Sequence, residues 1–391
     1  RMFGELGHGA AAGLLRDALS DSYWLVKANA ARALAQLQDS ESIPVLARMA
    51  AEDSTPKVRI ACMDALGAFG SDAAKTIPIW ERNLMNRAWQ IKVATCDAYR
   101  AIGDDAAVDM LIGRVDMEGG RVHDDIQKSL QQLTGMNKEW KSEQWRKWWK
   151  KAKRWKDLER RMKEKLEEEG QETGRKIGDR YASQTKKPPT YYGIQVYART
   201  VGYVLDISAS MNQGFRISPS CEPRLGHEFK GRTRIAVSKE ELVHSISRLD
   251  PRTRLNLVFF NERARLWRPV PVAAAGDGAN AASAVKNIQT KGRTNYYDAL
   301  RLILGMAGEG GGWSAKFADT PDTLFYLTDG EPTDGEITKA DELHAWFNER
   351  NRFSRLRVHV IAMGTTGVDL EFLSRLAGDN GGTFVHLTGT Y

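Results

Sequence analysis

Residues 201–211 read Val-Gly-Tyr-Val-Leu-Asp-Ile-Ser-Ala-Ser-Met. The opening run predicts a strand over 201–205, because a short apolar run before polar residues is typical of a strand buried on both faces. Asp206, Ser208 and Ser210 then follow at alternate positions, so that one carboxylate and two hydroxyls leave the end of this strand together. Ligands of open α/β sheets bind beyond the carboxyl ends of the strands, so this pattern indicates a ligand site.

The rest of the C-terminal half alternates apolar strands with amphipathic helices. Further strands are expected at 255–260, 264–267, 323–327, 358–363 and 383–387, and helices at about 232–249, 279–289, 296–307, 337–351 and 369–378. Such alternation predicts a doubly wound, Rossmann-like α/β fold with a mostly parallel six-stranded sheet. The turn at 261–263 is too short for a parallel crossover, so the strands that it joins form a hairpin with one antiparallel edge strand.

Two later segments bring more oxygen donors to the same edge of the sheet. Thr294 stands just before a predicted helix, and Asp329 follows the strand at 323–327. With Asp206, Ser208 and Ser210 they form a set of two carboxylates and three hydroxyls. An all-oxygen set of this kind suits Mg²⁺ or Mn²⁺, with water in the open positions.

The order Asp-x-Ser-x-Ser, a later Thr and a later Asp-Gly resembles the metal-ion-dependent adhesion site (MIDAS) of von Willebrand factor A (vWA) domains, over residues 191–391. The resemblance implies that Ser208, Ser210 and Thr294 are direct or nearly direct ligands. Asp206 and Asp329 would hold the cation directly or through water. It also implies a non-enzymatic protein–protein interaction domain, in which an acidic residue of a partner protein completes the coordination of the cation.

The N-terminal third repeats one helical face. Segments that begin at residues 26, 58, 91 and 122 repeat one pattern at offsets 0, +4, +8 and +11, apolar at every position except Thr95, with starts 32, 33 and 31 residues apart. Ile43-Pro44 and Ile77-Pro78 are expected to open second helices, because proline fits the first helical turn. The spacing resembles HEAT-type (PBS-lyase-like) repeats. We therefore predict an all-α solenoid of about four repeats over residues 1–137, which would offer a second binding surface.

Residues 138–190 form a connector of three predicted parts: a basic, tryptophan-rich helix, a charged helix and a proline-containing linker. Residues 138–165 hold 13 Lys or Arg and 5 Asp or Glu, a net charge of +8, so the other residues sum to +7 − 8 = −1. One interpretation is a cap for the last face of the solenoid, made by the stripe Trp145, Trp148, Trp149 and Trp155. The other is contact with nucleic acid or an anionic surface. The cations that would make it are Lys147, Lys150, Lys151, Lys153 and Arg154.

Three function classes follow from these patterns. HEAT repeats followed by an A domain resemble HEAT–vWA proteins of bacteria such as planctomycetes, which favours an interaction scaffold. The same order is similar to the Ro ribonucleoproteins, so an RNA-binding scaffold that uses the connector is the alternative. A phosphohydrolase is disfavoured, because Ser208 stands where a second acid is expected after Asp206 and no general base is evident.

Composition sets the remaining limits. The chain has 391 residues, of which 42% are hydrophobic and 27% charged, which is ordinary for two or three globular domains and excludes a disordered chain. Three cysteines are too few for a disulfide framework, and Cys62 and Cys96 are expected to be reduced core thiols. No apolar run is long enough to span a membrane. We expect the N-terminus to be incomplete, since the chain starts at Arg1, and the cell envelope or periplasm is slightly favoured over the cytoplasm.

Overall fold

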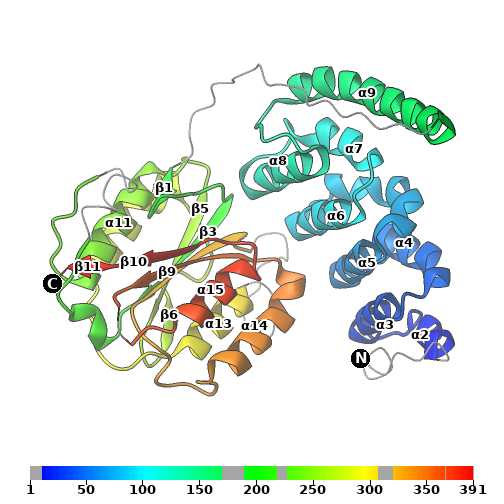
Figure 1. Cartoon of the computed structure of the whole chain (residues 1–391). Coiled ribbons are helices and arrows are strands. Elements are labelled where there is room, and N and C mark those ends of the chain that lie inside the picture. The colour runs from blue at the N-terminus through cyan, green and yellow to red at the C-terminus, as the bar shows by residue number, and fades with distance from the viewer. Residues whose placement is uncertain (1–10, 170–188, 218–226, 307–319, 366, 391) are drawn as a thin grey trace. The chain divides into compact units, whose positions relative to one another are not determined.

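The structure is a computed structural model that describes residues 11–169, 189–217, 227–306, 320–365 and 367–390. The described residues form two compact units, one helical and one of α/β type (Figure 1). The linker that the sequence predicts before residue 190 lies almost wholly outside the described residues, as does Cys221. No helix in the described ranges is both long and apolar enough to cross a membrane.

The helical unit is a stack of helices, as predicted. In chain order it contains α2 (Ala12–Ala18), α3 (Trp24–Gln36), the 3₁₀ turn η2 (Ser40–Ser42), α4 (Ile43–Glu52), α5 (Pro56–Ala68), the 3₁₀ segment η3 (Gly70–Met85), α6 (Trp89–Ile102), α7 (Ala106–Arg114) and α8 (Gly120–Thr134). The four predicted faces lie on α3, α5, α6 and α8. A Cβ added to Gly67 of α5 would lie 3.2 Å from the Cβ of Ala101 in α6, so small residues let these helices approach closely.

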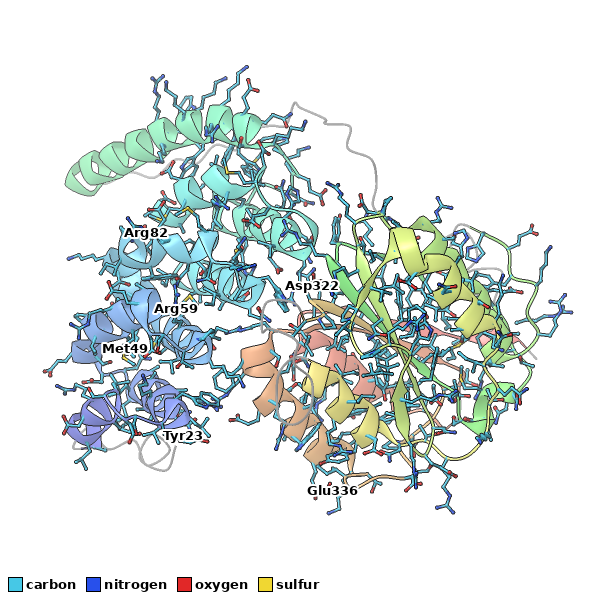
Figure 2. The ribbon with its side chains drawn as sticks, turned by 180° about the vertical axis from the view of Figure 1, so that it is seen from behind. Tyr23, Met49, Arg59, Arg82, Asp322 and Glu336 are labelled. Carbon is cyan, nitrogen blue, oxygen red and sulfur yellow. The ribbon has the colours of Figure 1, made fainter. Side chains whose placement is uncertain are left out.

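Polar side chains inside this unit join one repeat to the next. Lys27 of α3 makes an ion pair with Asp53 at 2.7 Å. Arg59 of α5, labelled in Figure 2, donates from Nε to the carbonyl of Ala50 in α4 at 3.0 Å and also contacts Asn83. Each basic residue therefore satisfies groups that stacking would otherwise bury unpaired.

One predicted helix start in this unit is wrong. Pro44 lies in the first turn of α4, as expected, but Ile77-Pro78 lies inside η3, which has a non-helical residue at Trp80 (φ −115°, ψ 17°). Proline in a helix interior removes a hydrogen-bond donor and crowds the preceding turn, which accounts for short 3₁₀ turns in place of an α-helix.

The basic helix α9 (Ser142–Glu169) has a buried tryptophan face, which favours the cap interpretation, with one exception. Trp145 is fully buried, Trp149 is 2% exposed, and the indole N–H of Trp145 donates to Oε1 of Gln127 in α8 at 3.0 Å. Trp155 is 54% exposed, so the prediction that it belongs to the buried stripe is wrong. Ten residues after Trp145, it has turned away from the covered face.

The α/β unit is built on the sheet β10-β9-β8-β3-β5-β6. Its strands are β3 (Thr200–Asp206), β5 (Arg254–Phe260), β6 (Ala264–Leu266), β8 (Thr323–Thr328), β9 (Arg357–Met363) and β10 (Phe384–Leu387). The strand pairs from β10 to β5 are parallel and β6 runs antiparallel to β5, which confirms the predicted fold class. A two-residue strand, β7 (Val272–Ala273), also pairs with β5. The short strands β1 (Thr190–Tyr191), β2 (Ile194–Gln195), β4 (Arg216–Ile217) and β11 (Gly389–Thr390) pair outside this sheet.

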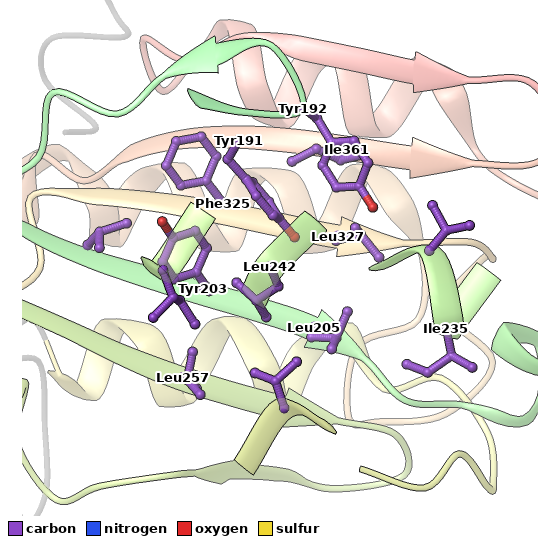
Figure 3. Packing of buried hydrophobic residues seen from close by; sticks show 14 of the residues in the cluster. Tyr191, Tyr192, Tyr203, Leu205, Ile235, Leu242, Leu257, Phe325, Leu327 and Ile361 are labelled. Atoms are coloured by element: carbon purple, nitrogen blue, oxygen red, sulfur yellow. The ribbon is translucent and has the colours of Figure 1, made fainter. Parts of the chain in front are cut away.

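Helices cover both faces of the sheet. They are α11 (Arg234–Arg248), α12 (Ala274–Lys286), α13 (Tyr296–Met306), α14 (Ala340–Ser354) and α15 (Leu370–Gly378). Tyr203 and Leu205 of β3 pack into a core with α11 and α12, part of which Figure 3 shows, whereas Val204 packs into a second core with α13, α14 and α15. Because β3 pairs on both edges and is covered on both faces, its C-terminal end is held rigidly at the rim of the sheet.

Candidate metal centre

Three loops meet at the C-terminal end of β3. Asp206 is the last residue of β3, Ser208 directly precedes the 3₁₀ turn η4 (Ala209–Asn212), and Ser210 belongs to that turn. The loop before α13 is tied to this turn, because the N–H of Ala209 donates to the carbonyl of Gly292 at 3.0 Å. Backbone bonds thus fix the loop that carries Thr294 against the loop that carries the two serines.

Four of the five predicted ligands are joined by hydrogen bonds. The Oγ atoms of Ser208 and Ser210 lie 3.0 Å apart, and Ser210 Oγ donates to Oδ1 of Asp329 at 2.8 Å. The backbone N–H of Ser208 donates to Oδ1 of Asp206 at 2.8 Å. The loops after β3 and β8, 119 residues apart in sequence, therefore present their oxygens to one another.

Thr294, the fifth predicted ligand, lies at the same place. Its side chain is 5% exposed, and a Cβ added to Gly330, next to Asp329, would be 3.9 Å from its Oγ1. The N–H of Thr333 donates to the carbonyl of Thr294 at 2.9 Å, which fixes the loop after β8 to the loop before α13. All five predicted residues are thus brought to one edge of the sheet.

The two carboxylates of this cluster make it a place for positive charge. Asp206 is fully buried, and burial, followed by the nearby charge of Asp329, raises the pKa of its carboxyl to about 7. Hydrogen bonds from Thr328 and Ser208 act in the opposite direction. Two buried carboxylates surrounded by hydroxyl oxygens are a donor set into which a hard divalent cation fits, since it would offset the charge that burial makes costly.

Sequence reasoning missed three residues of this cluster. Thr328 donates from Oγ1 to Oδ2 of Asp206 at 2.6 Å, and the hydroxyl of Tyr296 lies 2.9 Å from the same Oγ1. Arg234, 2% exposed, donates from Nη1 to Oδ2 of Asp329 at 2.7 Å. The position of Thr328 beside Asp329 is a weak sequence signal, whereas nothing local marks Arg234, which lies 95 residues from its partner.

The cluster has only two carboxylates, too few to hold a metal ion with acidic side chains alone. Among the residues that the structure describes, no group of three or more His, Cys, Asp or Glu side chains is arranged to hold a metal ion.

Family comparisons give the same two-part division. A model of HEAT repeats matches residues 11–84, and a model of the von Willebrand factor type A domain matches residues 201–331. The C-terminal unit contains a vWA domain. HEAT repeats precede it, as the spacing predicts.

The curated relatives match at most about half of this chain, at low sequence identity. Inter-alpha-trypsin inhibitor heavy chain H4 of Homo sapiens is 29% identical over 192 residues, which is 49% of this chain and 18% of that protein. Heavy chain H1 of Sus scrofa is 28% identical over 146 residues, which is 37% of this chain and 14% of that protein. This chain thus spans less than a fifth of the length of these relatives.

The solved structures that match this chain are distant from it in sequence. A von Willebrand factor type A protein from Catenulispora acidiphila has a TM-score of 0.36 and 16% identity, with 49% of this chain and 39% of that chain covered. BatB from Bacteroides thetaiotaomicron gives 0.33 and 17%, with 49% and 91% covered. Proximal thread matrix protein 1 of the mussel byssus, with a zinc-occupied MIDAS motif, gives 0.31 and 16%, with 48% and 41% covered.

The predicted basic cluster of the connector is not one continuous free surface. Lys147, Lys150, Lys151 and Arg154 of α9 are exposed, but Lys153 makes an ion pair with Asp109 of α7. Its ammonium also lies 5.4 Å from the ring centre of Trp149. One of the five cations thus helps to hold the cap, and the RNA-binding alternative stays a prediction, as do the bacterial origin and the cell-envelope location.

Proposed function

We propose that the vWA domain binds one divalent cation, Mg²⁺ or Mn²⁺, through Asp206, Ser208, Ser210, Thr294 and Asp329. We further propose that a carboxylate of a partner protein completes the coordination. The observation that supports this most directly is the hydroxyl of Ser210, which lies 3.0 Å from Ser208 Oγ and 2.8 Å from Asp329 Oδ1. It joins donors from two different strands at the rim of the sheet.

The ligand types favour binding of an anion over chemistry on a substrate. A cation held largely by hydroxyls keeps more of its charge than one held by carboxylates, and so supplies an electrophilic centre for a carboxylate oxygen. The role of the protein residues is to fix that centre at the rim. The HEAT repeats would give a second surface for the same or another partner, since stacked helix pairs present extended faces.

The surroundings of two histidines support a non-enzymatic role. His344 lies 3.0 Å from a carboxylate oxygen of Asp379, and Nδ1 of His359 accepts the backbone N–H of Thr383 at 2.9 Å. Both side chains are buried and have structural partners. Neither belongs to the hydroxyl and carboxylate cluster as a general base would.

A Mn²⁺ titration followed by electron paramagnetic resonance tests the cation site. Wild-type protein should bind one Mn²⁺, and Mg²⁺ should displace it. Removing both hydroxyls in S208A/S210A should weaken binding by about tenfold or more, since two of the five ligands are lost. Ser283→Ala, an exposed serine of α12, is the matched control and should bind as wild type.

A capture experiment tests the partner. A protein retained from lysate in Mg²⁺, released by EDTA and lost with S208A/S210A would support the proposal. Retention that survives EDTA but disappears after nuclease treatment would instead favour the RNA-binding alternative. Equal binding of Mn²⁺ by wild type and S208A/S210A would contradict the site itself.

A further inference from the structure

A buried arginine lies against the proposed metal site. Arg234, the first residue of α11, is 2% exposed, and its Nη1 donates to Oδ2 of Asp329 at 2.7 Å. The other oxygen of Asp329, Oδ1, accepts from Ser210. Both oxygens of this carboxylate are therefore engaged by groups of the chain itself.

The fold makes room for this guanidinium. Gly364 follows β9 with φ +98°, and a Cβ at that position would lie 2.5 Å from Arg234 Nη2 and 3.0 Å from its Cζ. The start of α11 is fixed as well, since the N–H of Arg234 donates to the carbonyl of Gln213 at 3.1 Å. A glycine at positive φ packed against a buried cation indicates a positioned group, because any other residue there would be both strained and in collision.

Arg234 changes the sum of formal charges at the proposed metal site. Asp206 and Asp329 contribute −2 when ionised, Arg234 contributes +1, and a divalent cation would bring the total to +1. A carboxylate from outside would bring it to zero. Without the arginine, the two aspartates alone would neutralise the cation, and a carboxylate from outside would bring the total to −1. Unbalanced buried charge is unfavourable, so the neutral combination is the favoured one.

We propose that Arg234 couples occupancy of the metal site to an anionic ligand: its positive charge weakens binding of the cation alone and attracts the carboxylate that completes the coordination. This inference rests on the proposed function, because it takes the cation site as given. Arg234 then acts as a specificity-determining residue that favours carboxylate-bearing partners over neutral ones. By linkage, the cation raises the affinity for the carboxylate by the same factor as the carboxylate raises that for the cation.

The experiment uses the full chain, Mn²⁺ as the cation and acetate as the carboxylate. Free Mn²⁺ is measured by electron paramagnetic resonance in sodium acetate and in sodium chloride of equal ionic strength, and a protein-free blank corrects for binding of Mn²⁺ by acetate. Wild type is compared with R234Q, which keeps a hydrogen-bond donor but no charge. R234K keeps the charge on a different donor and is the matched control. Circular dichroism and thermal unfolding verify that each variant is folded.

The expected pattern has two parts. In chloride, R234Q should bind Mn²⁺ about tenfold or more tightly than R234K, because a unit charge close to a buried divalent cation repels it strongly. In acetate, wild type and R234K should gain more affinity for Mn²⁺ than R234Q does, because only they attract acetate with the charge at position 234. The rise in thermal unfolding temperature that Mn²⁺ causes should follow the order of the affinities of these proteins for Mn²⁺.

The results that would overturn the inference differ from the result that would also overturn the proposed function. Weaker Mn²⁺ binding by R234Q than by R234K in chloride would mean that Arg234 only orients Asp329, and would overturn the inference. No gain in acetate for wild type would also overturn it, and this measurement needs no variant to fold. If wild type bound Mn²⁺ and only the acetate effect were missing, the proposed cation site would stand. If wild type bound no Mn²⁺ at all, both would fall.

Discussion

Trp145 offers a direct test of how the helical unit ends. Its side chain is fully buried, its indole N–H donates to Gln127 Oε1 at 3.0 Å, and its ring centre lies 5.1 Å from that of Trp140 and 6.0 Å from that of Trp148. Trp145→Ala removes the largest group that α9 places in the core of this unit. If α9 is a structural cap, this loss should loosen the end of the unit.

The size of the effect follows from the kind of group removed. Truncation of a buried aromatic residue to alanine costs about 3–5 kcal/mol, and each aromatic pair contributes about 0.5–1.5 kcal/mol of this beyond its area. We expect a loss of about 4 kcal/mol, which corresponds to about a thousandfold in the opening equilibrium. Trp155→Ala is the matched control in the same helix, because Trp155 is 54% exposed and its removal should cost well under about 1 kcal/mol.

Hydrogen exchange followed by mass spectrometry locates the loss. Amides of α8 should exchange far faster in Trp145→Ala than in wild type, whereas peptides from β3 in the vWA domain should be unchanged and serve as the internal reference. Protection of α8 that stays within about threefold of wild type would refute the cap. Equal losses in the two tryptophan variants would refute it as well, because burial would then not be the cause.

Three further results are expected. Burial raises the pKa of the Glu241 carboxyl to about 7, against a backbone N–H bond from Tyr192 that lowers it, so its contribution to stability is present below about pH 4.5 and is lost as pH rises through 7. In urea, the free energy of unfolding of Glu241→Gln should therefore rise relative to that of wild type by about 2 kcal/mol between pH 5 and pH 8. A difference that does not change with pH would contradict this. Gly364→Ala should destabilise the vWA domain by about 2 kcal/mol or more and lower its thermal unfolding temperature, because the new methyl group would collide with Arg234. An unchanged temperature would show that the loop adapts. Chelation by EDTA should leave the far-ultraviolet circular dichroism unchanged and lower stability by about 1.4 kcal/mol from the value at a metal concentration tenfold above its dissociation constant, and loss of secondary structure would contradict a preformed site.

The sequence predicts the central sheet closely, because buried strands are continuous apolar runs. Residues 201–205 and 255–260 were expected to be strands, and β3 and β5 extend these ranges by only one or two residues. Helix α12 is less well predicted: it begins at Ala274, five residues before the expected start. Its first turns hold Gly276 and Gly278, which are poor helix formers and carry no apolar stripe, so only packing on the sheet accounts for their helical conformation.

Some residues of the candidate site could likewise be predicted from the sequence, and others could not. Asp206 and Asp329 could be placed together, because each follows a parallel strand and the carboxyl ends of such strands share one edge. Arg234 could not, since a lone arginine at a helix start is ordinary in sequence and becomes informative only when Asp329 is found 2.7 Å away. For Trp155 the sequence predicts too much. Its spacing fits the tryptophan stripe, but the residue lies beyond the surface that the stripe covers and is exposed.

The groups that sequence reasoning missed also explain why the site keeps its shape. Oδ2 of Asp206 accepts from Thr328, whose hydroxyl in turn lies 2.9 Å from that of Tyr296, and the Tyr296 ring packs against Phe260 and Phe372. The carboxylate is thus held, through two hydroxyls, by an aromatic core. A site fixed in this way loses little conformational freedom when it binds an ion, so binding can be decided by charge. Since the fold supplies the positions of the oxygens, the residue that sets the charge balance becomes the one that sets which ligand is accepted.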